Sequence, residues 1–375
     1  MDAARADTFV RPVRILALVT EAFGGRGGIA QYNRDLILAL AAGPRAASAQ
    51  ILPRLAPDPP GSLPPGVVQH RPLFARAAYA LKALWLVART RPDVVFCGHL
   101  YMAPLAGVLA ALARARLAVQ LHGVETWTSP TPAQRRAVES ADLVLCVSRD
   151  TRRHVLAWSN QPPERVVVLP NTVGEGYAPG DAAAARARLG LGQETVLLSV
   201  GRLDARERYK GHERVIRLLP ELLREHGPMA YLIAGDGDDR PRLEALARDA
   251  GVAAHVRFLG QVEHADLPLL YRAADAFVLP STGEGFGIVY LEAMACGTPA
   301  IGLAAGGAAD ALGDGDLGAA VADEDLAAAI LRALVLSRGR APADAARRDL
   351  AQRTRDRFGV AQFRGFAQAL LACVT

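Results

Sequence analysis

The sequence predicts an α/β protein of two domains, each a parallel sheet with helices on both faces. Short apolar, β-branched runs alternate along the chain with segments whose apolar residues recur at helical spacing. At 375 residues the chain also exceeds the size at which one hydrophobic core stops growing. The alternation restarts after a Gly- and Pro-containing stretch at 171–181, so we expect domains over residues 1–175 and 176–358.

The elements follow in chain order. In the first half the expected strands are residues 13–20, 93–99, 117–123, 142–148 and 165–171, with helices over 29–41, 103–115, 132–141 and 149–158. In the second half the expected strands are residues 195–203, 229–238, 255–262, 276–285 and 298–303. Ligands of such sheets bind beyond the carboxyl ends of the strands, so the loops there are examined first.

Composition limits the class of protein. No apolar run is long enough to span a membrane, and acids stand where a signal peptide has its basic region, so we expect a cytoplasmic protein. Residues 1–175 hold 20 Arg and Lys against 12 Asp and Glu, whereas the remainder holds 23 against 26. The basic first half is compatible with peripheral contact to an anionic membrane face, and equally with scattered surface arginines. The four cysteines lack metal-site spacing and are expected to be buried thiols.

The most informative segment is STGEGFGIVYLEAMACGTPAIG, residues 281–302. A strand ends in a loop carrying Glu284, and a helix is expected from Ile288 to Ala295, before Gly297 and Pro299. Free backbone amides at a helix N-terminus attract phosphate. The residues that would provide this phosphate site are Gly285, Phe286, Gly287, Ile288 and Val289. Glu292 lies on the otherwise apolar helix, where a buried carboxylate needs hydrogen-bonding partners such as a ribose diol, unless it is a structural ion-pair residue.

Lys210 is one of only two lysines in a chain that otherwise uses arginine. An ammonium is a compact point charge, and beside Gly211 it is placed to meet a phosphate. Arg202 precedes it by eight positions, with Arg206 and Arg208 in the same loop as substitutes. A solvated run of charges is the alternative interpretation.

These motifs resemble the blocks of the retaining family 4 glycosyltransferases of the GT-B fold. Their signature is a glutamate, seven residues and a second glutamate, which Glu284 and Glu292 match. The segments SVGRL with KG, IAGDGDDRPRLEALA, VRFLGQV and LEAMACGTPAIG come in the family's order, and GGIAQYNRDL, LHGVETW and VLPN are similar to its N-terminal blocks. The resemblance implies two Rossmann-like, doubly wound domains facing across a cleft, with the acceptor on the first and a nucleotide-sugar donor on the second.

The resemblance also implies roles for individual residues. Arg202 and Lys210 would hold the donor diphosphate, and Glu284 and Glu292 would bind hydroxyls of the transferred sugar and of the ribose. His122, after an apolar strand, would contact the donor sugar near its reacting carbon; a structural histidine is the alternative. Further donor contacts are expected at Gly27, Gly28 and Val262.

Several other segments of the sequence allow more than one interpretation. The glycine loop at 24–28 lacks the third glycine and the later acid of a dinucleotide fingerprint, so it is either a donor-facing loop or a tight turn. Asp236 and Asp238 suit a metal, but we expect a loop, no metal and no cofactor. Segment 73–91 is a basic, aromatic helix that either touches a membrane or, as we favour, covers the sheet. The resemblance implies that the helix over 359–375 packs back on the first domain; a helix that caps only the second domain is the alternative.

The sequence thus predicts a retaining hexosyltransferase (glycosyltransferase) that uses a UDP- or GDP-sugar, needs no metal, and acts on a saccharide or lipid-linked acceptor in glycan or polysaccharide biosynthesis. The alternatives are a nucleotide-binding non-catalytic paralogue and an epimerase or phosphorylase of the same fold. Nucleic acid is not expected as a partner.

Overall fold

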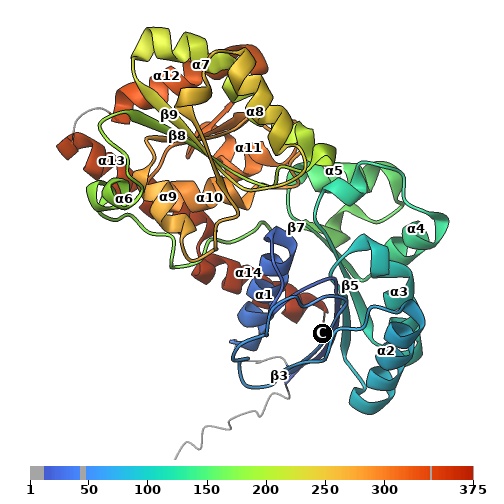
Figure 1. Ribbon diagram of the computed structural model, residues 1–375. Coiled ribbons are helices and arrows are strands. Elements are labelled where there is room, and N and C mark those ends of the chain that lie inside the picture. The colour runs from blue at the N-terminus through green and yellow to red at the C-terminus, as the bar shows by residue number, and fades with distance from the viewer. Residues whose placement is uncertain (1–11, 43–47, 338–339, 375) are drawn as a thin grey trace, which may run out of the picture. The chain divides into compact units, whose positions relative to one another are not determined.

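Contacts divide the chain of the computed structural model into two units, which comprise residues 1–147, 152–169 and 363–375, and residues 148–151 and 170–362 (Figure 1). The structure describes residues 12–42, 48–337 and 340–374. The main division falls at 169/170, whereas the sequence predicts it after residue 175.

The first unit is built on a seven-stranded parallel sheet in the order β3-β2-β1-β4-β5-β6-β7. Its strands are β1 (Arg14–Val19), β2 (Ser48–Pro53), β3 (Val67–Gln69), β4 (Val94–Cys97), β5 (Arg116–Leu121), β6 (Leu143–Cys146) and β7 (Val166–Val168). Its α-helices are α1 (Gly28–Ala41), α2 (Arg76–Thr90), α3 (Ala103–Ala113), α4 (Pro132–Glu139), most of α5 (Arg149–Trp158) and most of α14 (Val360–Val374), with short 3-10 turns η1 (Leu100–Met102), η2 (Val124–Thr126) and η3 (Pro163–Arg165).

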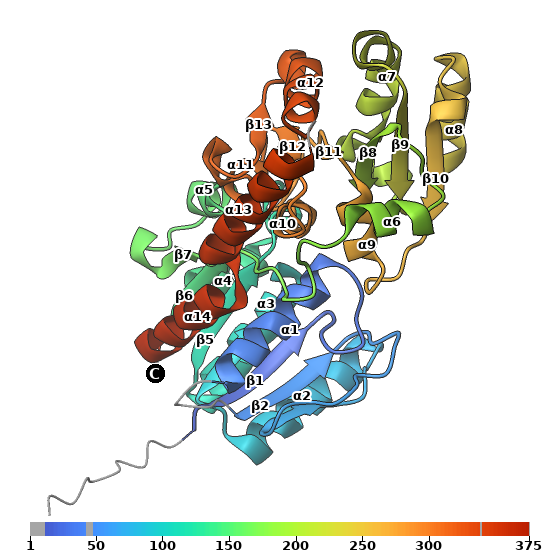
Figure 2. The ribbon, with the colours of Figure 1, turned by 90° about the vertical axis from the view of Figure 1, so that its left-hand side faces the viewer.

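Alternate strand residues of this sheet meet different helices, because successive side chains of a strand point to opposite faces. Leu16, Val95 and Val119 share a core with α2 and α3, whereas Ile15 and Phe96 face α1 and α14. The ribbon shows these helices on the two sides of the sheet (Figure 2). The sheet is therefore doubly wound, as predicted.

The last helix, α14, lies against α1 within the first unit. Phe363 packs edge-on against Tyr32, with ring centroids 5.8 Å apart, and Gln368 Nε2 donates to the carbonyl of Ala39 at 3.1 Å. Cys373, in the last turn of this helix, is exposed, so the expectation of four buried thiols is wrong at this position. The side chains that α14 turns to the sheet are Phe363, Ala367, Leu370 and Leu371, and Cys373 lies beside that stripe.

The second unit has a six-stranded parallel sheet in the order β10-β9-β8-β11-β12-β13. Its strands are β8 (Thr195–Val200), β9 (Met229–Ala234), β10 (Val256–Gly260), β11 (Ala276–Leu279), β12 (Ala300–Leu303) and β13 (Ala319–Val321). Its helices are α6 (Ala182–Arg188), α7 (His212–His226), α8 (Arg240–Asp249), α9 (Leu267–Ala273), α10 (Ile288–Ala295), α11 (Ala308–Ala311), α12 (Leu326–Ser337) and α13 (Arg340–Phe358), with 3-10 turns η4 (Ala205–Lys210), η5 (Ala253–His255), η6 (Gly313–Gly315) and η7 (Asp323–Asp325).

Both strand orders reverse direction at one point, between β1 and β4 in the first unit and between β8 and β11 in the second. Chain connections leave such a point in opposite directions, which opens a crevice at the carboxyl ends of the two central strands. In the second unit, the loops that follow β8 and β11 carry Arg202, Lys210 and Glu284. The sheet order thus predicts that these side chains meet.

A glycine is required at position 235, directly after β9, because the backbone of Gly201 passes close to it. Its φ is 149°, and a Cβ added there would lie 1.8 Å from the carbonyl oxygen of Gly201, at the end of β8. Gly201 precedes Arg202, so the contact sets the start of the loop after β8. A side chain at 235 would displace the backbone that carries the basic residues.

We therefore expect Gly235→Ala to destabilise the protein by at least about 2 kcal/mol, because the added methyl group must move backbone atoms. Urea unfolding of the wild type and the variant measures this loss. Gly174→Ala is the matched control, since a Cβ there would meet no atom within 4 Å. An equal effect of the two substitutions would contradict the close packing at Gly235.

Candidate functional site

The loop after β8 approaches the loop after β11 through a glycine. Gly211 has φ 78°, and a Cβ on it would lie 2.2 Å from the carbonyl oxygen of Pro280. The backbone amide of Thr282 donates to the carbonyl of Tyr209 at 2.9 Å. Lys210 stands between these two contacts and is therefore held at the crevice edge of the sheet.

The ammonium of Lys210 lies between two carboxylates. Its Nζ is 3.2 Å from Glu284 Oε1 and 3.9 Å from Glu207 Oε2, and all three side chains are 13–15% exposed. Burial alone would lower the pKa of Lys210, but the charges of Glu284 and Glu207 outweigh it and raise the pKa. The lysine is a permanent cation in a poorly solvated place, where its interaction with an anion is strong.

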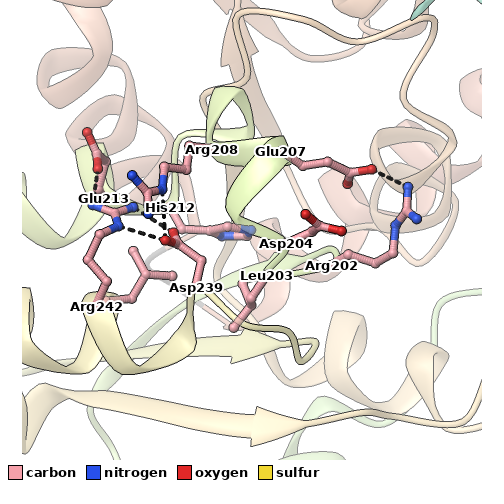
Figure 3. A pocket seen from close by; sticks show the side chains of 10 residues that line it. Arg202, Leu203, Asp204, Glu207, Arg208, His212, Glu213, Asp239 and Arg242 are labelled. Carbon is pink, nitrogen blue, oxygen red and sulfur yellow. Dashed lines mark hydrogen bonds and ion pairs between the residues drawn. The ribbon is translucent and has the colours of Figure 1, made fainter.

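Arg202 reaches the same group through Glu207, whose Oε1 accepts a hydrogen bond from the Arg202 guanidinium (Figure 3). The Arg202 side chain is 75% exposed, so it is free to change its partner. Arg206 and Arg208, the substitutes considered from the sequence, instead pair with Asp204 and Asp239. Of the loop's arginines, Arg202 is thus the one that shares a carboxylate with Lys210.

The helix α10 begins as the sequence predicts, with Gly287 as its N-cap at φ 91° and Ile288 and Val289 in its first turn. Gly287 has no side chain to cap the helix, so the first amides of α10 are left for another partner. Phe286 is buried and packs against Phe358, with ring centroids 5.8 Å apart. The carbonyl of Glu284 accepts from the amide of Gly307 at 2.7 Å, which holds the turn that includes Gly285.

Glu292 is buried inside the second unit, with 2% of its surface exposed. Its Oε2 accepts a hydrogen bond of 2.8 Å from the Tyr271 hydroxyl, and the Tyr177 hydroxyl is a second partner. Burial raises the pKa of Glu292 to about 7, and the two hydrogen bonds oppose this shift. The partners that a buried carboxylate requires are therefore tyrosines of the protein, and the contact to a ribose stays a prediction.

His212, the first residue of α7, was not singled out by the sequence analysis. It is 5% exposed, and neither ring nitrogen has a hydrogen-bond partner in the described part of the chain. Burial and the nearby Lys210 lower its pKa to about 4, so the ring is neutral. A cavity of about 10 Å³ is lined by His212, Glu207 and Arg202, among others (Figure 3). This volume approaches that of one water molecule, a suitable partner for the ring.

The aspartates of the GDGDD turn are engaged with the protein. Asp238 accepts from the amide of Ala205 at 2.7 Å, and Asp236 accepts from the amide of Gly237 at 2.9 Å. Within the described residues, no group of three or more His, Cys, Asp or Glu side chains is placed to hold a metal ion. Val262 is half-buried and follows β10, two residues after Gly260, which adopts φ 69°.

Three predicted site residues belong to the first unit. His122 follows β5, and its Nε2 lies 3.0 Å from the carbonyl oxygen of Gly98, while Glu125 accepts from its backbone amide at 2.7 Å. Burial lowers the pKa of His122. Gly27 is the N-cap of α1 at φ 83°, where a Cβ would meet no atom within 4 Å, and Gly28 begins the helix. These residues therefore border the carboxyl ends of β1, β4 and β5.

Two doubly wound parallel-sheet units in one chain are the architecture of the GT-B fold. The family model "Glycosyltransferase Family 4" matches residues 26–174, and "Glycosyl transferases group 1" matches residues 181–357. The chain belongs to the family 4 glycosyltransferases, which confirms the resemblance drawn from the sequence.

Relatives that the chain matches include two mycobacterial enzymes. The chain is 39% identical over 223 residues to GDP-mannose-dependent alpha-(1-6)-phosphatidylinositol monomannoside mannosyltransferase of Mycolicibacterium smegmatis, across 55% of this chain and 57% of the relative. It is 37% identical over 180 residues to D-inositol 3-phosphate glycosyltransferase of Mycobacterium bovis, across 47% and 37% of the two chains. The matches therefore span about half or less of these relatives.

Solved structures share the fold over nearly the whole length. Sucrose-phosphate synthase from Thermosynechococcus elongatus superposes with a TM-score of 0.76 at 24% identity, covering 96% of this chain and 98% of that one. HepE of Anabaena in complex with UDP and glucose gives a TM-score of 0.75 at 20% identity, covering 96% and 100%. At these identities the likeness establishes the fold alone.

The raised pKa of Glu292 makes stability depend on pH. Between about pH 4.5 and 7 the folded carboxyl holds its proton longer than the unfolded one, so this group makes stability fall as pH rises. As the pH rises between these two values, we expect the free energy of unfolding of Glu292→Gln to increase by on the order of 3 kcal/mol relative to that of the wild type. Urea unfolding of both proteins across this range gives the difference, with exposed Glu164→Gln as control. A difference that does not change with pH would contradict the shift.

Proposed function

We propose that the protein is a glycosyltransferase that transfers a hexose from a nucleotide diphosphate sugar to a saccharide or lipid-linked acceptor, with retention of the anomeric configuration. The observation that carries the proposal is the largely buried ammonium of Lys210, which lies beside Glu284 at the point where the strand order of the second unit reverses. A diphosphate needs a fixed cation there, and the sugar attached to it needs hydroxyl acceptors. Membership of family 4 supports the same chemistry.

Each group then has one task. Lys210 and Arg202 neutralise the charge that develops on the departing diphosphate, and the amides at the start of α10 add further donors. Glu284 accepts hydroxyl hydrogens of the transferred sugar, while Glu292 binds the ribose or orients it through its tyrosines. His122, Gly27 and Gly28 of the first unit contribute to the sugar and phosphate contacts. No side chain is assigned as a covalent nucleophile.

The expected course is displacement on one face of the sugar. The acceptor hydroxyl attacks the anomeric carbon while the bond to the diphosphate breaks, and the diphosphate accepts the hydroxyl proton. The protein provides orientation and charge stabilisation. We propose that no metal takes part, because Lys210 and Arg202 supply the positive charge, and that the reaction belongs to cytoplasmic glycan or polysaccharide biosynthesis.

Two alternatives remain for the same fold. A non-catalytic paralogue would bind nucleotide and form no product, an epimerase would convert the nucleotide sugar into its isomer, and a phosphorylase would transfer a glycosyl group to phosphate. Product analysis separates them: transfer to an acceptor supports the proposal, while donor binding without any turnover supports the paralogue. The anomeric configuration of the product, read by nuclear magnetic resonance, tests retention.

Calorimetric titration with UDP, GDP and ADP tests the donor site. The name of the mannosyltransferase relative favours GDP-mannose as the first donor, and the UDP complex of HepE makes UDP-glucose the second. We expect one nucleotide to bind, and Lys210→Met to cut turnover at least about a hundredfold by removing the cation. Lys82→Met, at the only other lysine, is the control and should keep wild-type turnover with a water-soluble acceptor.

Binding of none of the three nucleotides would reject the donor site. Full turnover in Lys210→Met, checked to be folded by circular dichroism, would reject the phosphate role of that lysine. Glu292→Gln should weaken nucleotide binding, and unchanged affinity would remove the ribose assignment.

Glu207 generates a separate expectation, since it neutralises the cations that the diphosphate needs. Glu207→Gln removes the competing charge, frees Arg202 and should tighten binding of the nucleoside diphosphate about fivefold. Glu213→Gln is the matched control, because this carboxylate lines the same cavity but pairs with Arg242. Weaker binding in Glu207→Gln would show that the carboxylate orients the basic residues instead of competing for them.

A further inference from the structure

The helix α2 is apolar on two sides. Tyr79, Ala83, Leu86 and Val87 are buried against the sheet, as expected for a covering helix. Leu81, Leu84 and Trp85 are 67%, 45% and 50% exposed, and their spacing of three and four residues places them along one stripe. Covering the sheet therefore accounts for the four buried residues of this helix but not for its exposed large apolar side chains.

The neighbouring helix α3 continues the exposed stripe. Val108 and Leu112 are 58% and 63% exposed, again four residues apart on one side. The helices α2 and α3 contact one another and pack on the same face of the first unit's sheet (Figure 1). Their outer sides consequently form one surface.

Aromatic residues extend this surface at the amino-terminal ends of both helices. Phe74 is 77% exposed, and Tyr101 is 45% exposed with the guanidinium of Arg76 above its ring, 5.8 Å from the centroid. We call the set of exposed side chains the α2–α3 face; it comprises Phe74, Leu81, Leu84, Trp85, Tyr101, Val108 and Leu112. It holds half of the large hydrophobic side chains that the described residues expose. Contiguous apolar patches of this kind mark interaction sites.

The segment that carries the α2–α3 face is basic. Residues 70–115 contain six basic residues, Arg71, Arg76, Lys82, Arg89, Arg91 and Arg114, and a single acid. That acid, Asp93, is paired with Arg14 at 2.9 Å. Lys82 lies over the ring of Trp85 with Nζ 3.8 Å from its centroid, which leaves the indole among cations. The segment that forms the α2–α3 face thus carries an excess of positive charge.

Lys82 lies within the apolar stripe, and the other five basic residues lie toward its two ends. Arg76 begins α2 and Arg71 precedes it, while Arg89 and Arg91 lie at the end of α2 and Arg114 at the end of α3. A helix lying in a membrane interface has this pattern, since the apolar side enters the acyl region and long basic side chains reach the phosphates. Trp and Tyr prefer the same interface. None of the helices formed by the described residues is long and apolar enough to cross a membrane.

We propose that the α2–α3 face docks the protein on the surface of a membrane that contains anionic lipids. Apolar residues supply the insertion and arginines supply the preference for negative headgroups. The inference concerns this surface alone and is independent of the donor chemistry proposed above. If both hold, docking would bring a lipid-linked acceptor to the enzyme.

Flotation of the full chain with vesicles tests the proposal. One set of vesicles is pure phosphatidylcholine, and the other contains phosphatidylglycerol. We expect binding to the anionic vesicles, and a loss of about tenfold in affinity for Trp85→Glu, because a large apolar side chain no longer enters the lipid. Phe366→Glu is the matched control: this aromatic residue is 59% exposed on α14, which lies on the opposite face of the sheet, and the variant should bind like the wild type.

A second variant, Arg71→Gln/Arg76→Gln/Arg89→Gln, should lose the preference for phosphatidylglycerol. No binding to either vesicle, or equal binding by the wild type and Trp85→Glu, would overturn the proposal. A dimer in gel filtration that Trp85→Glu dissociates, without vesicle binding, would assign the face to a second copy of the chain and overturn it too. Nucleotide titration of the same variants should be unchanged, so failure here is distinguishable from failure of the donor site.

Discussion

The second unit is organised around the placement of one ammonium group between two carboxylates at a sheet edge. Lys210 can lie there because Gly211 lets the chain pass against Pro280, and because Glu284 and Glu207 stabilise its charge where water is scarce. Removing one partner of such a group leaves an uncompensated charge. The attraction between the Lys210 ammonium and the two carboxylates therefore holds the two loops together. A phosphate ligand would bind to the same ammonium. Stability and binding share the same side chains.

Much of this arrangement follows from the sequence. The β-branched runs predicted ten of the strands, and the stop signals at Gly297 and Pro299 predicted α10 with its observed ends. The contact of Lys210 with Glu284 depends on the sheet order, because both residues follow strands that are neighbours in the sheet. The strands β2, β3 and β13 were missed, since SAQILP, VVQ and AAV are short or interrupted by polar and small residues.

The remaining features depend on contacts that periodicity does not encode. Glu207 lies three residues before Lys210 in η4, which is kinked at Glu207 with φ −110°. Tyr271 is 21 positions from Glu292, and its hydroxyl meets the carboxylate through the packing of α9 beside α10. The sequence did not reveal the exposed stripe of α2, because the spacing of apolar residues does not tell which of two apolar sides of a helix is covered. Helical spacing predicts the helix, and packing decides what it leaves exposed.

The distribution of the cysteines has a practical consequence. Cys97, Cys146 and Cys296 are buried, and burial raises the pKa of Cys97 and of Cys296 to about 12, so thiol reagents meet little thiolate there. Cys373 is exposed near the end of α14. The natural chain consequently offers a single accessible attachment point for a fluorophore or a spin label, at a helix that belongs to the first unit. A reporter can be installed without first replacing any residue.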